Sequence, residues 1–185
     1  MGSRAEQARE GNASGASMLW VPGPLPSLNQ LLDERARSFR RGAKLWNGYS
    51  DLKRVWEERI LVQARVQGFR PLRSGDFCYT FCEPDRRRDP SNVSSGALKL
   101  IEDALVKAEL LINDGWASVK KLEVCFEVDP KEPGVFLEVL DAQPWERTAE
   151  DERKERVERI KREIDGNLRK ARAHARARPR AERDA

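Results

Sequence analysis

A long helix-forming run lies in the middle of this chain and limits how the segments on either side of it can be arranged. Between Ser91 and Ala108, apolar residues recur every three or four positions, which predicts a helix of about seventeen residues with one face packed on a core. The apolar positions are Val93, Ala97, Leu100, Ile101, Ala104, Leu105 and Ala108. Asp89-Pro90 precedes this helix and Asn113-Asp114-Gly115, a turn signal, follows it, so that two acids bracket one helix.

The lengths of the helix and of the segment after it suggest where the second acid lies. Seventeen helical residues extend about 26 Å, and a return from Glu109 to Asn113, if extended, covers about 17 Å. We therefore expect Asp114 to come back approximately within reach of Asp89. The helix face opposite the apolar one is polar and carries Asn92, Ser95, Lys99 and Asp103.

Four short elements of this region resemble the RusA family of Holliday-junction resolvases, which is common in bacteriophages and prophages. The family pattern is an arginine-rich strand end, Asp-x-Asp-Asn, a helix ending in Asp-Ala-Leu, and a hydrophobic return to an acidic pair or Asn-Asp. Here these elements are Arg86-Arg87-Arg88, Asp89-Pro90-Ser91-Asn92, Asp103-Ala104-Leu105 and Asn113-Asp114. The resemblance extends more weakly over residues 19–140. Ser91 stands where the family usually has its second aspartate, so one expected metal-binding carboxylate is absent.

The resemblance implies a single α/β domain, RusA-like, with helices packed on a mixed β-sheet. It also implies a metal-dependent endonuclease that cuts four-way junctions or related branched DNA as a homodimer. Mg²⁺, or Mn²⁺ in its place, prefers oxygen ligands and needs no histidine or cysteine. Asp89 and Asp114 are the expected metal ligands and catalytic acids, and Asn92 is expected to position or supplement the site. Lys99, on the same helix face as Asn92, is a further expected catalytic residue that contacts a scissile or neighbouring phosphate. The arginines expected to hold the DNA backbone are Arg86, Arg87 and Arg88.

The residues themselves leave other interpretations open. Asp89 before Pro90 is also a common helix opening, in which the carboxylate caps the first-turn amides. Asp114 before Gly115 is also a plain turn, and the three arginines are also a solvated strand end that pairs with neighbouring acids. Because serine is a poor magnesium ligand, a second candidate function is the binding of branched DNA with little or no cleavage.

The whole chain divides into three predicted parts. Residues 1–17 lack an apolar period and are expected to be a disordered leader. Residues 18–141 form the predicted nuclease domain, and residues 142–185 a charged helix followed by a basic tail. Within the domain, the basic segment 29–48 contains aromatics and suits phosphate contact, although such a segment is more often a solvated surface loop. Its expected DNA contacts are Arg40, Arg41 and Lys44.

Period-two and helical patterns predict the order of elements as strand, loop, helix, strand, helix, strand, strand. The predicted strands are 19–21, 76–82, 122–128 and 135–140, and the predicted helices are 50–66, 91–108 and 148–164. The last two strands, which are separated by a Pro- and Gly-containing turn, are expected to form a hairpin. This order predicts an α/β layer with helices packed on a mixed sheet.

The composition of the chain limits the class of protein that it can belong to and the kind of partner that it can bind. The 185 residues carry a formal net charge of +4, and 36% of them are charged, which favours an anionic partner such as DNA. No apolar run approaches twenty residues and no signal-peptide pattern is present, so we expect no membrane association and a cytoplasmic location in a bacterial cell, with a phage or prophage gene as one source. Three isolated cysteines and a single histidine predict neither a disulfide framework nor a zinc site.

Overall fold

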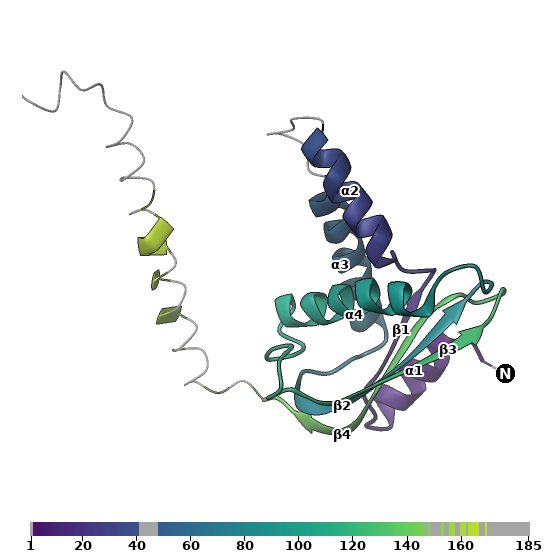
Figure 1. Ribbon diagram of the computed structural model, residues 1–185. Coiled ribbons are helices and arrows are strands. Elements are labelled where there is room, and N and C mark those ends of the chain that lie inside the picture. The colour runs from purple at the N-terminus through teal and green to yellow at the C-terminus, as the bar shows by residue number, and fades with distance from the viewer. Residues whose placement is uncertain are drawn as a thin grey trace, which may run out of the picture. The chain divides into compact units, whose positions relative to one another are not determined.

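The computed structural model describes residues 2–40 and 48–146, together with residues 148, 153, 156–157, 160–161, 163–166 and 169 of the C-terminal part. The chain forms two compact units, Met1–Trp145 and Glu146–Ala185. The first unit holds the sheet and its helices (Figure 1). In the second unit, the described residues from 153 onwards are helical, in agreement with the helix predicted there. None of the described helices is long and apolar enough to cross a membrane.

The first unit is an α/β fold built on one mixed four-stranded sheet, as predicted. Its strands are β1 (Met18–Pro22), β2 (Leu72–Glu83), β3 (Val119–Val128) and β4 (Gly134–Pro144). Their order across the sheet is β1-β4-β2-β3, so β1 and β3 are the two edges. β4 is antiparallel to both of its neighbours, whereas β2 and β3 are parallel.

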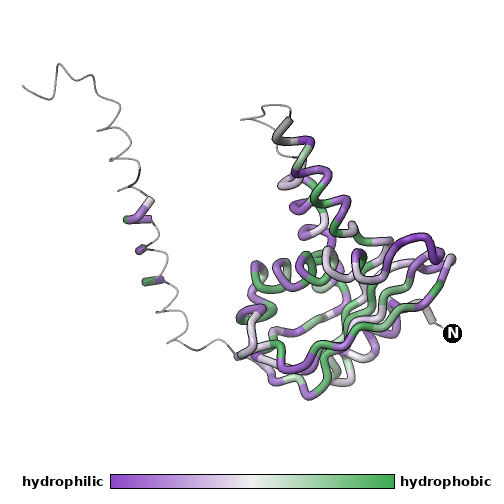
Figure 2. Tube along the Cα trace, in the orientation of Figure 1, coloured by the Kyte–Doolittle hydropathy of each residue, from purple (hydrophilic) through white to green (hydrophobic). Residues whose placement is uncertain are grey.

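Four helices cover the sheet: α1 (Arg4–Ala13), α2 (Leu28–Arg40), α3 (Gly48–Val66) and α4 (Pro90–Lys107). The main core lies between the sheet and α2, α3 and α4, and it contains Phe77, Tyr79 and Phe81 of β2. A smaller core under α1 joins Ala8 to Trp20, Cys82 and Phe136 on the other face. Figure 1 shows α1 and α4 on opposite sides of the sheet. In Figure 2 the strands are mainly hydrophobic, while α2 and α3 mix both kinds of residue as amphipathic helices do.

The predicted disordered leader is instead a helix packed on the sheet. α1 begins with a capping box, in which Ser3 and Glu6 satisfy each other's backbone N–H groups. Asn12, which is 2% exposed, ties the end of α1 to the core: its amide donates to the carbonyls of Met18 and Gln67, and its oxygen accepts from the N–H of Met18. Polar contacts therefore hold a helix that lacks an apolar period.

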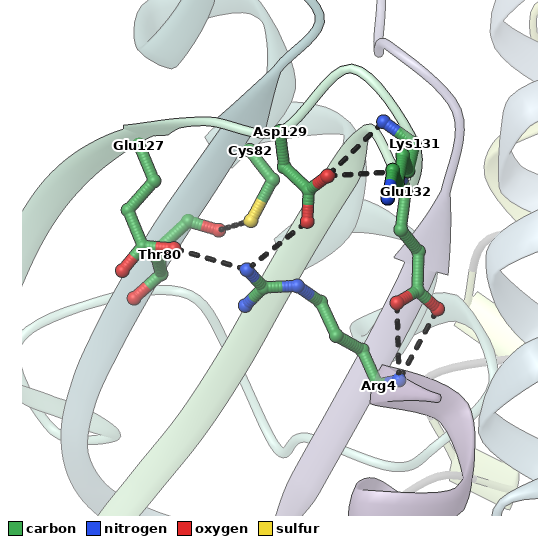
Figure 3. Close-up of polar contacts among 7 residues, drawn as sticks. All are labelled: Arg4, Thr80, Cys82, Glu127, Asp129, Lys131 and Glu132. Carbon is green, nitrogen blue, oxygen red and sulfur yellow. Dashed lines mark hydrogen bonds and ion pairs between the residues drawn. The ribbon is translucent and has the colours of Figure 1, made fainter. Parts of the chain in front are cut away.

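Arg4 fastens the other end of α1 to the edge of the sheet. Its guanidinium lies 3.0 Å from Glu127 on β3 and 3.6 Å from Asp129 in the following turn. Its backbone N–H donates to Glu132 of the same turn (Figure 3). α1 thus reaches across the sheet from edge strand β1 towards edge strand β3.

The predicted hairpin of the last two strands is wrong. β2 lies between β3 and β4, pairing with β3 from Gly75↔Val119 to Glu83↔Val128 and with β4 along its other side. The alternation of β3 is the same whichever strand it pairs with, so the pattern did not reveal its neighbour. β2, α4 and β3 form a parallel strand–helix–strand unit, in which the helix returns the chain to the starting end of the sheet.

Helix α4 was predicted to within one residue at each end. Its buried face is that of the apolar stripe, and Gly96 belongs to it because the helix passes close to the segment before α2. A Cβ on Gly96 would lie 2.8 Å from the backbone of Pro26 and Leu28. Glu109, with a positive φ of 59°, closes the helix, and the N–H of Leu110 bonds back to the carbonyl of Leu105. The return after α4 is therefore a turn rather than the predicted extended segment.

Candidate functional site

Asp89 occupies the N-cap position of α4, but its side chain makes no capping hydrogen bond. Its backbone is extended, with φ −71° and ψ 121°, and Pro90 follows at the first helical position. The carboxylate is exposed and takes part in no ion pair found among the described residues. A capping aspartate usually stabilises its helix by about 1 kcal/mol through that hydrogen bond. The structure therefore does not support capping as the role of this carboxylate.

The three arginines before Asp89 differ in their surroundings. Arg88 is held inside the fold: Nε and Nη2 each donate to Glu83 at 2.7 Å, and Nη1 donates to the carbonyl of Leu25 at 2.7 Å. The side chain of Arg87 is 89% exposed and lies 3.5 Å from Asp85. Arg86 is exposed. Arg88 is thus a structural residue, whereas Arg86 and Arg87 present their charge to solvent.

Asn92 and Ser91 begin the first turn of α4. The side-chain oxygen of Asn92 accepts from the N–H of Asn29 at 3.1 Å, so it joins the start of α4 to the start of α2. Ser91 is exposed, and its carbonyl accepts from Ser95 at 2.6 Å. Asn92 therefore has a positioning contact, and Ser91 leaves an open position beside Asp89.

Lys99 and Asp114 meet at a second place, which we call the Lys99 cluster and which consists of Lys99, Glu102, Asp103 and Asp114. The ammonium of Lys99 bonds to Asp114 and lies 2.8 Å from Asp103. Asp103 also bonds to Lys53 of α3 at 2.5 Å. Lys99, which was expected to contact a phosphate, is therefore paired with carboxylates of its own chain.

Charge pairing and burial shift the pKa values in the Lys99 cluster in opposite directions. Hydrogen bonds to Asp103 and Asp114 raise the pKa of Lys99, and the hydrogen bond from Lys99 lowers the pKa of Asp114. Burial would raise the pKa of Asp103, but the hydrogen bonds from Lys53 and Lys99 outweigh it and lower that pKa. Burial and then repulsion by Asp114 raise the pKa of Glu102 to about 7. Glu102 therefore holds its proton to a higher pH than a carboxyl in water does.

Asp89 and Asp114 do not come together within one chain. Lys99, which bonds Asp114, lies ten residues after Asp89, or roughly 15 Å along α4. The parallel pairing gives the same answer: Asp89 follows the last residues of β2, whereas Asp114 precedes Val119, which pairs with Gly75 near the start of β2. The two acids lie at opposite ends of the strand pair.

The magnesium site implied by the resemblance does not fit this arrangement. No group of three or more His, Cys, Asp or Glu side chains that could hold a metal ion occurs in the part of the chain that the structure describes. Asp114 is already neutralised by Lys99, and Asp89 is too far away to share an ion with it. Accordingly we assign no chemical step to a metal within one chain.

Some predicted DNA-binding residues lie outside the described residues, and some residues near the site had not been predicted. The predicted DNA contacts Arg41, Lys44 and the side chain of Arg40 lie outside the described residues. The residues near the site that had not been predicted are Glu102 and Trp116. Glu102 accepts from the buried hydroxyl of Tyr79 at 3.4 Å, a contact between distant residues that no local pattern reveals. Trp116, in the loop after Asp114, is 94% exposed, and an aromatic so close to an expected catalytic acid was a signal in the sequence.

Neither a protein-family model nor a curated protein matches this chain. The RusA resemblance therefore rests on the motifs themselves, and membership of that family stays a hypothesis.

Proposed function

We propose that this chain is an endonuclease of branched DNA, related to the RusA resolvases, that hydrolyses a phosphodiester bond near the start of α4. The observation that carries the proposal is the free carboxylate of Asp89, which neither caps its helix nor forms an ion pair in the described part of the chain. An uncompensated acid next to exposed arginines is more useful for chemistry on a phosphate than for stability.

The start of α4 has the charges that such a reaction needs. Arg86 and Arg87 are exposed and precede Asp89 directly, so they can hold the DNA backbone while Asp89 lies beside the phosphate to be cut. Arg88 keeps this segment in place through Glu83 and Leu25. Asn92 fixes the first turn of α4 against α2. These contacts hold the backbone around Asp89 without using its carboxylate.

A specific observation favours a second candidate, a protein that binds branched DNA without cutting it. Ser91 supplies no carboxylate, and Lys99 occupies the carboxylate of Asp114. Binding alone needs only the basic residues, since phosphate contacts supply most of the affinity.

A cleavage assay separates the two candidates. A four-way junction and a linear duplex of the same sequence are incubated with the full chain in Mg²⁺, in Mn²⁺ and in excess chelator. We expect junction cleavage by the unsubstituted chain, and the chelator arm shows whether it needs a metal. We expect loss of cleavage in Asp89→Asn with junction binding unchanged or slightly tighter, because the substitution removes negative charge near phosphate. Asp51→Asn, on α3, is the matched control.

Each outcome of this assay decides one question. Cleavage at the normal rate by Asp89→Asn refutes the role given to that carboxylate. Junction binding without cleavage by the unsubstituted chain supports the second candidate instead. Equal affinity for the junction and the duplex refutes both.

A further inference from the structure

Trp116 is held almost entirely in solvent by a loop whose backbone is fixed. Its side chain is 94% exposed, the largest value among the exposed large hydrophobic residues that the structure describes. The side-chain oxygen of Asn113 accepts from the N–H of Gly115 at 2.9 Å, and the carbonyl of Gly115 accepts from the N–H of Ser118 at 2.9 Å. Ser118 is 1% exposed, and its carbonyl accepts from the N–H of Gly75 on β2 at 3.0 Å. The loop therefore has a defined structure that presents the indole outwards.

Trp116 lines a surface pocket that lies away from the start of α4, and we call it the Trp116 pocket. It has a volume of about 380 Å³ and is lined by the 114–116 turn and the first four residues of β3, Val119, Lys120, Lys121 and Leu122. In Figure 1 this is the place where the loop after α4 leads into β3. It is at the opposite end of the β2–β3 pair from Asp89, so it is separate from the site proposed for cleavage.

The lysines make this pocket attractive to an anion. Lys120 is exposed, and no ion pair of its ammonium is found in the described part of the chain. Lys121 pairs with Glu123 at 2.5 Å, but the two side chains are 58% and 48% exposed, and such a surface pair contributes at most about 1 kcal/mol. Asp114, which also lines the pocket, is bonded to Lys99. A phosphate that approaches Trp116 therefore meets lysine without an uncompensated carboxylate beside it.

The exposure of Trp116 and the lysines around it select among the groups that can stack on an indole. Sites for small molecules bury about 70–90% of the ligand, and an indole that is 94% exposed does not enclose one. The centre of a protein interface is depleted in lysine and aspartate, whereas Asp114 and two lysines line this pocket. The bases of a duplex are already stacked on one another. An unpaired base has a free face, and an aromatic side chain binds that face whatever the base.

We propose that the Trp116 pocket binds one unpaired base of a single-stranded nucleic acid, with the indole of Trp116 stacked on the base and Lys120 in contact with the adjoining phosphate. The fixed loop favours this binding, because an aromatic that is already in place loses little conformational entropy when the base stacks on it. The proposal goes beyond the proposed nuclease function and does not rest on it, since neither contact uses Asp89.

Binding of the full chain to labelled oligonucleotides, followed by fluorescence anisotropy, tests the stacking. Three probes are compared: a strand of thymidines, a strand of the same length made of abasic sites, and a closed duplex hairpin. We expect Trp116→Ala to weaken binding of the thymidine strand by about 5- to 100-fold, the loss that removal of one base–aromatic stack produces. Binding of the abasic strand and of the hairpin should not change, because neither offers a free base face.

Two further variants control for structure and for chemistry. Trp116→Phe should retain most of the affinity for the thymidine strand, because phenylalanine also stacks on a base. Val62→Ala, which removes a side chain that is 54% exposed on α3, should change nothing. Circular dichroism and urea unfolding should be the same for Trp116→Ala as for the unsubstituted chain, since so exposed a side chain contributes little to the fold.

Lys120→Ala tests the phosphate contact separately. It should weaken binding of the thymidine strand and of the abasic strand alike, and lower the salt dependence by about 0.7 of a log-log unit for the one phosphate lost. Lys131→Ala, an exposed lysine in the turn before β4, is the matched control. A strand of uridines beside the thymidine strand shows whether RNA or DNA binds more tightly, and a loss of either in Trp116→Ala supports the site.

Three results would overturn the proposal: unchanged affinity of Trp116→Ala for the thymidine and uridine strands, an equal loss on the abasic strand, or unchanged nucleic-acid affinity together with a lower mass in light scattering. The last result would assign Trp116 to a protein interface. Failure here is distinguishable from failure of the nuclease proposal. Junction cleavage that depends on Asp89 but not on Trp116, without the stacking effect, refutes the pocket alone, and stacking in a chain that does not cleave refutes the nuclease alone.

Discussion

Glu102 provides a test of the Lys99 cluster through stability alone. It lies on α4, half-buried, with the hydroxyl of Tyr79 on one side and the carboxylate of Asp114 nearby. Burial and this repulsion raise its pKa from 4.5 to about 7. Because the folded state holds the proton more tightly than the unfolded chain, the stabilisation is complete below about pH 4.5 and is lost as the pH rises through about 7.

The size of the effect follows from that difference in pKa. At about 1.4 kcal/mol for each pKa unit, the ionisation of Glu102 costs the folded state up to about 3 kcal/mol at pH 8. Water reaches part of the side chain and screens the repulsion, so we expect about 1–2 kcal/mol in practice. Glu102→Gln keeps the shape and the hydrogen bond to Tyr79 but never ionises.

Urea unfolding of Glu102→Gln and of the unsubstituted chain, each at pH 4 and pH 8, measures this effect. We expect equal free energies of unfolding at pH 4, within about 0.5 kcal/mol, and a more stable variant at pH 8 by about 1–2 kcal/mol. Glu10→Gln, an exposed position on α1, controls for the general loss of one negative charge. A Glu102→Gln chain no more stable than the unsubstituted chain at pH 8 refutes the reasoning.

Five further outcomes are expected. Arg88→Ala should lower the free energy of unfolding by about 2–4 kcal/mol in a urea titration, because it leaves the carboxylate of Glu83 buried without its partner; Arg87→Ala should leave stability unchanged and weaken junction binding in a mobility-shift assay. Asn12→Ala should cost about 2–3 kcal/mol by the same titration, since three backbone groups, the carbonyls of Met18 and Gln67 and the N–H of Met18, lose their partner. Gly96→Ala should cost about 1–3 kcal/mol, because the added methyl meets backbone rather than a movable side chain. A chain ending at Gly166 should bind junctions with a flatter salt dependence, by about one log-log unit for each phosphate that the removed tail had neutralised.

Elements with a strong local pattern were predictable from the sequence, and elements held by distant contacts were not. α4 and β2 have clear periods of about 3.6 and 2, and both lie where they were expected. α1 buries only Ala8 and Asn12, so hydrophobic spacing gave no sign of it. Its sequence did contain one signal, the Ser3-x-x-Glu6 capping box, which is typical of a helix start.

The candidate site was predictable in its residue types but not in its geometry. Asp114 was predicted from the motif as a metal ligand, and Lys99 from its helix face as a phosphate contact. The two side chains are in contact with each other as an ion pair. The partners of Asp103 and Glu102 are Lys53 and Tyr79, which come from other elements and depend on how α3, α4 and β2 pack. The sequence left the role of Asp89 open between a helix cap and an acid free for chemistry. The absence of a capping hydrogen bond from its side chain favours the second role.

The wrong hairpin and the wrong reach of Asp114 have one physical cause. When a helix connects two parallel neighbouring strands, it carries the chain from the end of the first strand back to the beginning of the second. A residue just before such a helix and a residue just after it therefore lie about a helix length apart, unless the connection folds back. The eighteen residues of α4 span about 27 Å, and the turn at Glu109 leads towards β3 rather than back along the helix. Asp89 and Asp114, which flank this helix, therefore lie at opposite ends of the β2–β3 pair and do not act on one phosphate within a single chain.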